Sequence, residues 1–398
     1  MIPKLLHYFP QKTVGCHSIN DVEYLNGVVY IATLLSGVFG YELNSNGELP
    51  CWQSSFLANA MQIWGDSLIS IGKRKVGLSG SEAVFQILDT RTGGAVIKPV
   101  TLPRKNYLKK YARRTSSGGE IIEDATETAP FLQKAIATSD KLYVLYRFSR
   151  EKATVEGKII RYDMEFGKDA ILCVYTLPEL KLLNHYDLSS SGASLFCLRY
   201  PYIFYYAWGE QLLCRLDMTT AQIQTAELTK SYAISCDHDF VYAGHGESIS
   251  LFTVSDLSFF ETIDLAGQMS EVNRLAKAEY DKVHEVNQQF AYLEREEKAK
   301  EHLRQRYSHP VELDGFVRMA AGYGERFLDI HGLCLCPERG MLAVATELGT
   351  SPGFLWDTQT RRPIAHLLGM PTVSRKIKIR YPYVLSCAYE DAHIWLLS

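Results

Sequence analysis

The segments LFCLRYPYIFYYA (195–207) and KIKIRYPYVLSCA (376–388) are two copies of one pattern, and they decide the fold. Each is an alternating apolar run, a tight turn at a proline and a second apolar run, which is typical of a β-hairpin. Both contain the tetrapeptide Arg-Tyr-Pro-Tyr, with an alanine at the same offset beyond it. The two segments are therefore repeats of one structural unit.

Further hairpin patterns recur along the chain, giving about seven copies in all. Behind most of them lie a third apolar run, a turn rich in Asp, Thr and Gly, and a fourth run, as in LCRLDMTTAQIQTAELT (213–229). Four strands per unit at a spacing of about 40 residues is the pattern of a β-propeller blade. The other hairpins are VEYLNGVVYIAT (22–33), MQIWGDSLISIG (61–72), AIATSDKLYVLY (135–146), AISCDHDFVYAG (233–244) and LCLCPERGMLAVAT (333–346).

The two ends of the chain complement each other. The last copy stops at HIWLLS (393–398) without a fourth strand, while KLLHYF (4–9) is a strand-like run that belongs to no other copy. A ring closed by these two segments has no exposed edge at the junction. We therefore predict an all-β protein, a single domain over 1–398, that forms a seven-bladed β-propeller closed by the N-terminal strand.

Residues 333–369 resemble a WD40 repeat. Pro337, Gly340, Trp356 and Asp357 stand at the places where that family has these residue types. The resemblance covers one blade, because the other copies lack the Trp-Asp dipeptide. It implies a propeller, with a quinoprotein-like or other divergent propeller left open.

About 100 residues exceed the length of seven blades of about 40 residues each. They form four insertions, at 72–82, 103–130, 149–169 and 268–309. Because strands alternate in direction, the loops between second and third strands and the loops between blades emerge on one face of a propeller. All four insertions fall on that face. Loops on a rigid scaffold often carry function, so we expect this face to bind a partner, although tolerated drift of surface loops is the alternative.

The insertion between blades 5 and 6 is predicted to contain a long helix, at 270–306 within 268–309. Apolar residues step by three and four along its first half, and charged residues follow. This stripe either packs on the propeller itself or binds a partner, including a second copy through a coiled coil. The candidate partner-binding residues on it are Val272, Tyr280, Val283, Val286, Phe290 and Leu293.

The insertion at 103–130 is expected to be a charged loop. Its basic run, with interleaved tyrosines, could bind an acidic protein surface or a nucleic acid, and the acidic GEIIEDATE (119–127) that follows could neutralise it. A solvated charged loop is the favoured interpretation over a nucleic-acid site. The candidate residues are Arg104, Lys105, Tyr107, Lys109, Lys110, Tyr111, Arg113 and Arg114.

No short catalytic or phosphate-binding motif occurs in the sequence. His331, Cys334 and Cys336 alternate with leucines in an expected innermost strand, which favours a core role over a metal site. No catalytic residue, metal or cofactor is therefore predicted. An enzyme, a hydrolase or lyase with a site in the axial channel, is the alternative, since propeller enzymes assemble their sites from several blades.

The composition is that of an ordinary globular protein, with a net charge of −3 and nine cysteines scattered through apolar runs. Such cysteines favour a reducing compartment, and no run reaches the ~20 apolar residues that span a membrane. We expect a cytoplasmic protein without membrane contact. The leading hypothesis is a non-catalytic scaffold that binds one or more protein partners in a multiprotein assembly, with the oligomeric state left open.

Overall fold

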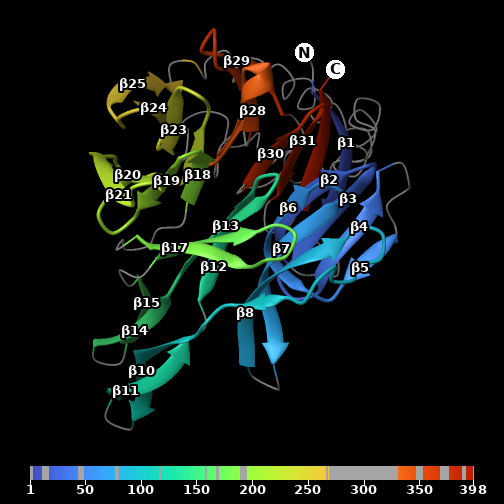
Figure 1. Ribbon diagram of the computed structural model, residues 1–398. Coiled ribbons are helices and arrows are strands. Elements are labelled where there is room, and N and C mark those ends of the chain that lie inside the picture. The colour runs from blue at the N-terminus through green and yellow to red at the C-terminus, as the bar shows by residue number, and fades with distance from the viewer. Residues whose placement is uncertain are drawn as a thin grey trace, which may run out of the picture.

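The structure, a computed structural model, is a ring of seven four-stranded antiparallel sheets with an eighth four-stranded sheet at one side (Figure 1). The ring confirms the all-β, seven-bladed prediction. The backbone is described for residues 3–10, 18–43, 49–76, 80–115, 118–128, 130–156, 159–166, 170–188, 195–265, 268, 330–346, 353–367, 376–387 and 391–397.

The first three blades, each given from its innermost to its outermost strand, use strands β2 to β9, β12, β13, β16 and β17. Blade 1 consists of β2 (Ile19–Leu25), β3 (Val28–Thr33), β4 (Gly37–Glu42) and β5 (Trp52–Ser54). Blade 2 consists of β6 (Leu57–Trp64), β7 (Ser67–Val76), β8 (Gly80–Asp89) and β9 (Val100–Thr101). Blade 3 consists of β12 (Phe131–Ala137), β13 (Lys141–Arg147), β16 (Ile171–Thr176) and β17 (Leu182–Asp187).

The next three blades follow the chain in order. Blade 4 consists of β18 (Leu195–Arg199), β19 (Tyr202–Ala207), β20 (Leu212–Asp217) and β21 (Gln222–Glu227). Blade 5 consists of β22 (Ala233–Cys236), β23 (Phe240–His245), β24 (Ser248–Thr253) and β25 (Phe259–Asp264). Blade 6 consists of β26 (Ile330–Cys336), β27 (Met341–Thr346), β28 (Gly353–Asp357) and β29 (Arg362–His366).

Blade 7 joins the two ends of the chain. Its inner strands are β30 (Lys376–Arg380), β31 (Tyr383–Cys387) and β32 (Asp391–Leu397), and its outermost strand is β1 (Pro3–Pro10). β1 pairs with β32 over their whole length, from Pro3 opposite Leu397 to Pro10 opposite Asp391. The predicted closure by the N-terminal strand is confirmed.

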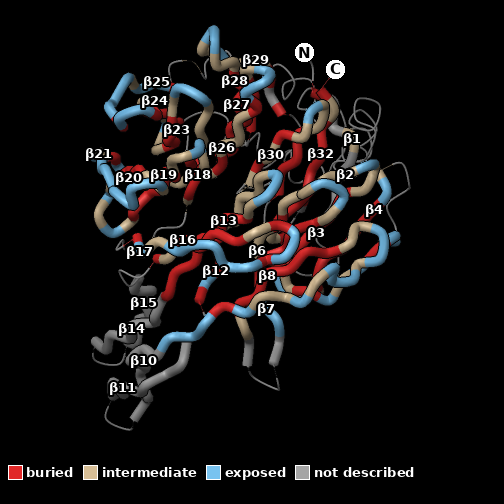
Figure 2. Tube along the Cα trace, in the orientation of Figure 1, coloured by how far each residue is buried: buried red, intermediate tan, exposed pale blue. Residues whose placement is uncertain are grey.

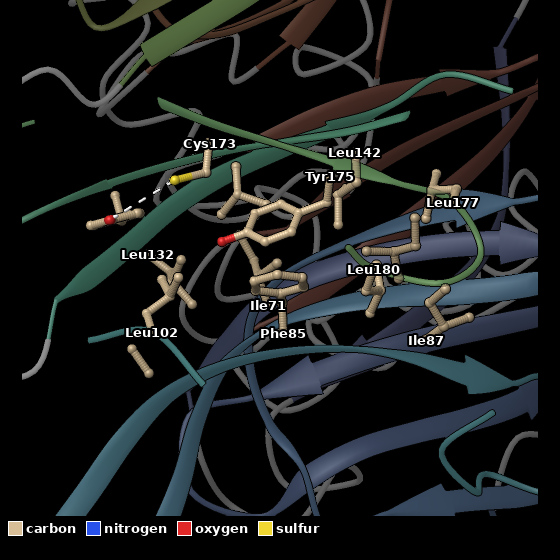
Figure 3. Close-up of a cluster of buried hydrophobic side chains, with 14 of the residues drawn as sticks. Ile71, Phe85, Ile87, Leu102, Leu132, Leu142, Cys173, Tyr175, Leu177 and Leu180 are labelled. Atoms are coloured by element: carbon tan, nitrogen blue, oxygen red, sulfur yellow. Dashed lines mark hydrogen bonds between the residues drawn. The ribbon is translucent and has the colours of Figure 1, made fainter. Parts of the chain in front are cut away.

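The core consists of seven clusters of buried apolar residues among the described side chains, one at each interface between neighbouring blades. In the cluster between blades 2 and 3, Ile71 and Phe85 face Leu142 and Tyr175 (Figure 3). The buried residues lie along the inner strands, whereas the outermost strands of blades 3, 4 and 5 are mostly exposed (Figure 2). Each blade therefore buries its two faces only against its neighbours.

Turn chemistry explains why the strands end where they do. Asn26 and Gly27 both have positive φ, as a two-residue hairpin turn requires. The turn between the third and fourth strands is capped by an aspartate in several blades: Asp357 Oδ1 accepts hydrogen bonds from the backbone N–H groups of Gln359 at 2.9 Å and Thr360 at 2.6 Å. This places Asp357, the aspartate of the WD40-like dipeptide, at the start of the turn between β28 and β29.

The predicted helical insertion is not confirmed, because the described residues contain no complete helix within it. The one complete helical element in those residues is the 3₁₀ turn Pro337–Arg339, and Leu265 and Gln268 also have helical backbone. No helix of the described residues is long and apolar enough to cross a membrane. The segment 268–309 lies outside the described residues except for Gln268, so the predicted coiled coil has no support. Its two anchors are defined: Leu265 N–H donates to the Glu247 carbonyl at 3.0 Å and Ile330 N–H to the Gly246 carbonyl at 3.2 Å, at the turn between β23 and β24.

Removal of residues 1–10 should open the ring, because β32 would lose its backbone partner and become an exposed edge. We expect the melting temperature to fall by at least about 5 °C. A synthetic peptide of residues 1–12, added in excess, should restore it. An unchanged melting temperature in the truncated protein would contradict closure by β1, and failure of the peptide to bind would contradict its role as a separate strand.

His393, on β32, is fully buried and stacks on Trp395 with ring centroids 5.5 Å apart. Burial lowers the pKa of its imidazole to about 3. Because the folded-state pKa of His393 lies below the unfolded value of about 6.5, the neutral ring contributes its full stability above about pH 6.5. As pH falls from about 6.5 to about 3, the free energy of unfolding should decrease by up to about 1.4 kcal/mol per pH unit. The free energy of unfolding of His393→Phe, measured with urea at several pH values, should lack this pH dependence. His238→Phe, a matched change at an exposed turn, should keep it.

Candidate functional site

Three β-hairpins extend from one face of the ring, at the insertions 72–82, 103–130 and 149–169 (Figure 1). The first is the long end of β7 and β8. The second is β10 (Lys105–Thr115) with β11 (Gly118–Thr128), and the third is β14 (Ser149–Glu156) with β15 (Ile159–Phe166). The one-sided placement agrees with the sequence analysis. The expected charged loop at 103–130 instead forms strands, because tyrosines, isoleucines and threonines, which suit strands, lie among its charged residues.

The second and third hairpins form one sheet, the projecting sheet, in the order β11-β10-β14-β15. β10 and β14 run parallel and pair at Lys110 and Lys152. The two hairpins come from different connections, one between blades 2 and 3 and one within blade 3. Their union was missed in the sequence analysis, since no local signal shows that two insertions will pair.

The predicted basic run lies on and just before β10. Arg104 and Lys105 are exposed, and the other six candidates, from Tyr107 to Arg114, are positions of β10. The register sets acidic residues of β11 opposite three of its cations: Lys109 pairs with Asp124, Lys110 with Glu123 and Arg113 with Glu120. The register therefore places acidic positions beside basic ones along this pair of strands, instead of a continuous row of basic positions.

Aromatic residues share one face of the projecting sheet. Successive residues of a strand alternate between faces, and Lys110 and Lys152, as bridge partners, share a face. Tyr107 and Tyr111 of β10 are therefore positions of the other face. That face also holds Ala153 and its partner Tyr162, with Phe166 farther along β15. We call the positions Tyr107, Tyr111, Tyr162 and Phe166 the aromatic face.

The six candidates on the predicted helix, Val272, Tyr280, Val283, Val286, Phe290 and Leu293, lie outside the described residues. The described residues that flank this segment, Leu265 and Ile330, are hydrogen-bonded to the turn between β23 and β24. That turn joins second and third strands, as the hairpins β7–β8 and β14–β15 do, so the anchors lie on the face that carries the projecting sheet.

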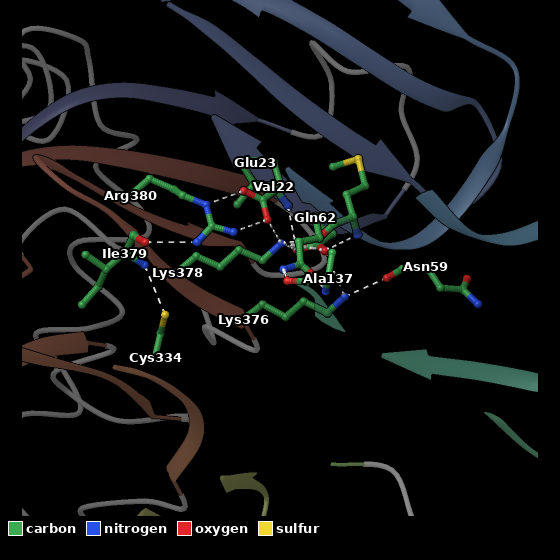
Figure 4. A network of polar contacts seen from close by, with 12 residues as sticks. Val22, Glu23, Asn59, Gln62, Ala137, Cys334, Lys376, Lys378, Ile379 and Arg380 are labelled. Carbon is green, nitrogen blue, oxygen red and sulfur yellow. Dashed lines mark hydrogen bonds and ion pairs between the residues drawn. The ribbon is translucent and has the colours of Figure 1, made fainter. Parts of the chain in front are cut away.

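A buried charge network lies at the innermost strands of blades 7, 1 and 2 (Figure 4). Lys378 Nζ lies 2.9 Å from Asp21 Oδ2 and 2.8 Å from Glu23 Oε1, and it also donates to the Met61 carbonyl at 2.9 Å. Arg380 holds both oxygens of Glu23, at 3.0 and 2.8 Å. Asp21 and Glu23 are 1% and 0% exposed, so these charges are shielded from water. The network joins three blades at the axis.

The network fixes the ionisation of Asp21 and Lys378. Burial raises the pKa of the Asp21 carboxyl, but Lys376, Lys378 and two hydrogen bonds outweigh it, so that its pKa lies below the ordinary value. Burial lowers the pKa of Lys378, and the two carboxylates raise it above its ordinary value. Both groups stay charged near neutral pH. Carboxylates held by cations in this way are poorly suited to general acid or base chemistry, which weakens the enzyme alternative.

The residues considered as metal ligands have other surroundings. The His331 ring stacks on Tyr232 with centroids 4.3 Å apart, and Cys334 Sγ accepts a hydrogen bond from the Ile379 N–H at 3.3 Å. Within the described parts of the chain, no three His, Cys, Asp or Glu side chains gather as metal ligands would. Cys336 is buried, and His331 and Cys334 are partly buried.

Among solved structures, the chain is similar to the WD40 repeats of RRP9, at a TM-score of 0.58 and 11% identity, over 100% of this chain and 99% of that one. It is also similar to the computationally designed protein Ika8, at a TM-score of 0.51 and 9% identity, over 96% of each chain. No family model and no curated protein matches the sequence. At these identities the similarity shows the fold: the chain is a seven-bladed β-propeller like those of WD40-repeat domains.

Glu23→Gln should destabilise the ring, because it removes the charge of a buried carboxylate that binds the partly buried Lys378 and Arg380. Breaking a buried ion pair from one side costs about 3–5 kcal/mol, which urea unfolding at pH 7 would measure. The matched change Glu179→Gln, at an exposed turn, should alter the free energy of unfolding by less than about 0.5 kcal/mol. Equal effects of the two variants would refute the network's role in joining the blades.

Proposed function

We propose that the protein is a non-catalytic propeller scaffold that binds a protein partner through the aromatic face of the projecting sheet. One observation carries the proposal: insertions from two separate connections pair into a single four-stranded sheet that the seven blades do not need for closure. Such a sheet adds a further surface to a ring whose blades bury their sheet faces against one another.

The dimensions suit a protein partner. Strands of 8 and 11 residues extend for about 26 and 36 Å at 3.3 Å per residue. One face of four such strands offers several hundred Å², which approaches the ~800 Å² that each side of an ordinary protein interface buries. Tyrosine is among the residues most enriched in interface hot spots, and three of the four positions of the aromatic face are tyrosines.

The alternatives have less support. Catalysis in the axial channel would need carboxylates free to exchange protons, whereas Asp21 and Glu23 are bound by cations. Nucleic-acid binding through residues 104–114 would need uncompensated positive charge, whereas β11 sets three acidic positions opposite the basic ones. Binding of a protein partner requires neither free carboxylates nor uncompensated positive charge.

The test compares two double variants on the same two strands. Tyr107→Ser with Tyr162→Ser removes side chains from the aromatic face, and Lys110→Ser with Arg161→Ser makes the matched change on the opposite face. Full-length protein carrying a proximity label in its native cells would report the neighbours of each form. We expect the aromatic-face variant to lose a defined set of labelled proteins at least tenfold, as two interface tyrosines of about 1–2 kcal/mol each imply.

The control outcomes separate the alternatives. The opposite-face variant should keep the same neighbours, and nuclease treatment should not change them. Identical neighbours for the wild type and the aromatic-face variant would overturn the proposal. Loss only in the opposite-face variant, together with sensitivity to nuclease, would favour nucleic acid. Light scattering of the purified protein would show whether the partner is a second copy.

A further inference from the structure

A groove lies between blades 2 and 3 on the face opposite the projecting sheet. It is lined by residues 63–67, at the turn between β6 and β7, and by residues 137–139, at the turn between β12 and β13. We call it the turn groove. Turns between first and second strands emerge opposite the loops that carry the projecting sheet, because successive strands alternate in direction. The volume of the groove, about 730 Å³, lies in the range of small-ligand sites, roughly 300–1,000 Å³.

Hydrogen bonds between the two blades hold the walls of the turn groove in place. Trp64 Nε1 donates to the Ser139 carbonyl at 3.1 Å. Two residues earlier, Gln62 Nε2 donates to the Ala137 carbonyl at 3.4 Å, and Gln62 Oε1 accepts from the Ala137 N–H at 2.8 Å (Figure 4). The indole ring therefore has a fixed orientation before any ligand binds, which reduces the entropy lost on binding.

Two groups of the turn groove have no partner within the described parts of the chain. Asp66 is exposed, and its carboxylate makes no hydrogen bond or ion pair there; the contact that it makes is through its backbone carbonyl, which accepts from Thr90 Oγ1 at 2.7 Å. Trp64 is partly exposed, and no cation or second ring of those parts stacks on it. Among the described residues of the lining, Asp66 is the one that carries a charge. The groove thus combines an aromatic wall with an uncompensated carboxylate.

Two cations at adjoining turns have other partners. Arg91 Nη2 lies 3.7 Å from Asp89 Oδ2, and Lys141 Nζ lies 3.9 Å from Asp140 Oδ2. Neither cation is paired with Asp66. The turn groove is therefore complementary to a positively charged ligand from another molecule.

We propose that the turn groove binds an arginine side chain of a partner protein, with the guanidinium group stacked on Trp64 and hydrogen-bonded to Asp66. A guanidinium is planar, stacks on aromatic faces and donates two parallel N–H groups to one carboxylate. A lysine ammonium is a compact, strongly hydrated point charge and matches this pair of groups less well. An alkylated ammonium is held by a cage of several rings, whereas Trp64 is the one aromatic ring among the described residues of the lining.

The volume of the turn groove favours a peptide segment over free arginine. A site in the size range of drug-sized ligands holds the arginine side chain together with flanking residues of its chain. The turn groove and the aromatic face lie on opposite faces of the ring and share no residue. The two proposals can therefore fail separately.

The first test titrates the full-length protein with arginine capped as the acetyl methylamide, and follows the tryptophan indole N–H resonances by NMR. The Trp64 resonance, assigned from its loss in Trp64→Phe, should shift and saturate with a dissociation constant of about 1–30 mM, because one exposed ion pair and one cation–π contact are each weak. The capped citrulline, which has the same shape without the charge, should shift this resonance less than a tenth as much. The capped lysine should bind at least threefold more weakly.

Variants of Asp66 test the carboxylate. Asp66→Asn should weaken binding of the capped arginine about three- to fivefold, and Asp66→Lys should abolish it. Asp239→Asn, a matched change at the exposed first turn of blade 5, should bind like the wild type. No shift at about 50 mM ligand, an equal shift with citrulline, or equal affinity of Asp66→Asn and the wild type would overturn the site. Tighter binding of the capped lysine would overturn the assignment to arginine.

The second test asks whether the ligand belongs to a protein. Proximity labelling by full-length Asp66→Lys, whose fold is checked by circular dichroism, should lose at least one neighbour that Asp239→Asn and the aromatic-face variant both retain. That neighbour should bind the purified wild-type protein, and capped arginine should compete with it. Identical neighbours for Asp66→Lys and the wild type would overturn the partner protein, whatever the result for the aromatic face.

Discussion

The structure depends on one constraint: the ring of blades must be closed where the first and last strands of the chain meet. Each blade buries its two faces only against its neighbours, so an open gap would expose two apolar faces at once. The chain meets this constraint twice. β1 completes blade 7 by backbone pairing, and Lys378 and Arg380 of blade 7 bind Glu23 of blade 1 at the axis. Backbone pairing sets the register of the junction, and the ion pairs hold it from inside.

The axis then divides into two chemically different halves. On one side, two buried carboxylates of blade 1 are neutralised by partly buried cations of blade 7. On the other side, the innermost strands of blades 3 to 6 carry Lys134, Cys197, Cys236 and Cys334. The first half is chemically quiet because each charge has its partner. The second half lies where the blades are joined by apolar packing.

Much of the fold could be predicted from short-range patterns. The Arg-Tyr-Pro-Tyr repeats, the Asn26-Gly27 turn and the unmatched runs at the two ends define hairpins and closure, because strand alternation and turn geometry are local properties. The site could not be predicted in the same way. Glu23 and Lys378 are separated by 355 residues, and their contact follows only from closure. The charges at 103–130 suggested a loop, because the acidic strand that pairs with the basic one is recognised only when the register is known.

The projecting sheet has a consequence for the ring as a whole. Seven similar blades give the ring an approximate rotational symmetry, so that one blade differs little from the next. A sheet built on the connections around blade 3 removes that ambiguity. A molecule held on this sheet would fix the rotational position of the propeller about its axis, so that each remaining turn, such as that of Tyr200 beside Lys141 or Tyr381 beside Arg339, would point in a defined direction. The sheet thereby gives the propeller a defined rotational orientation relative to the molecule that it holds.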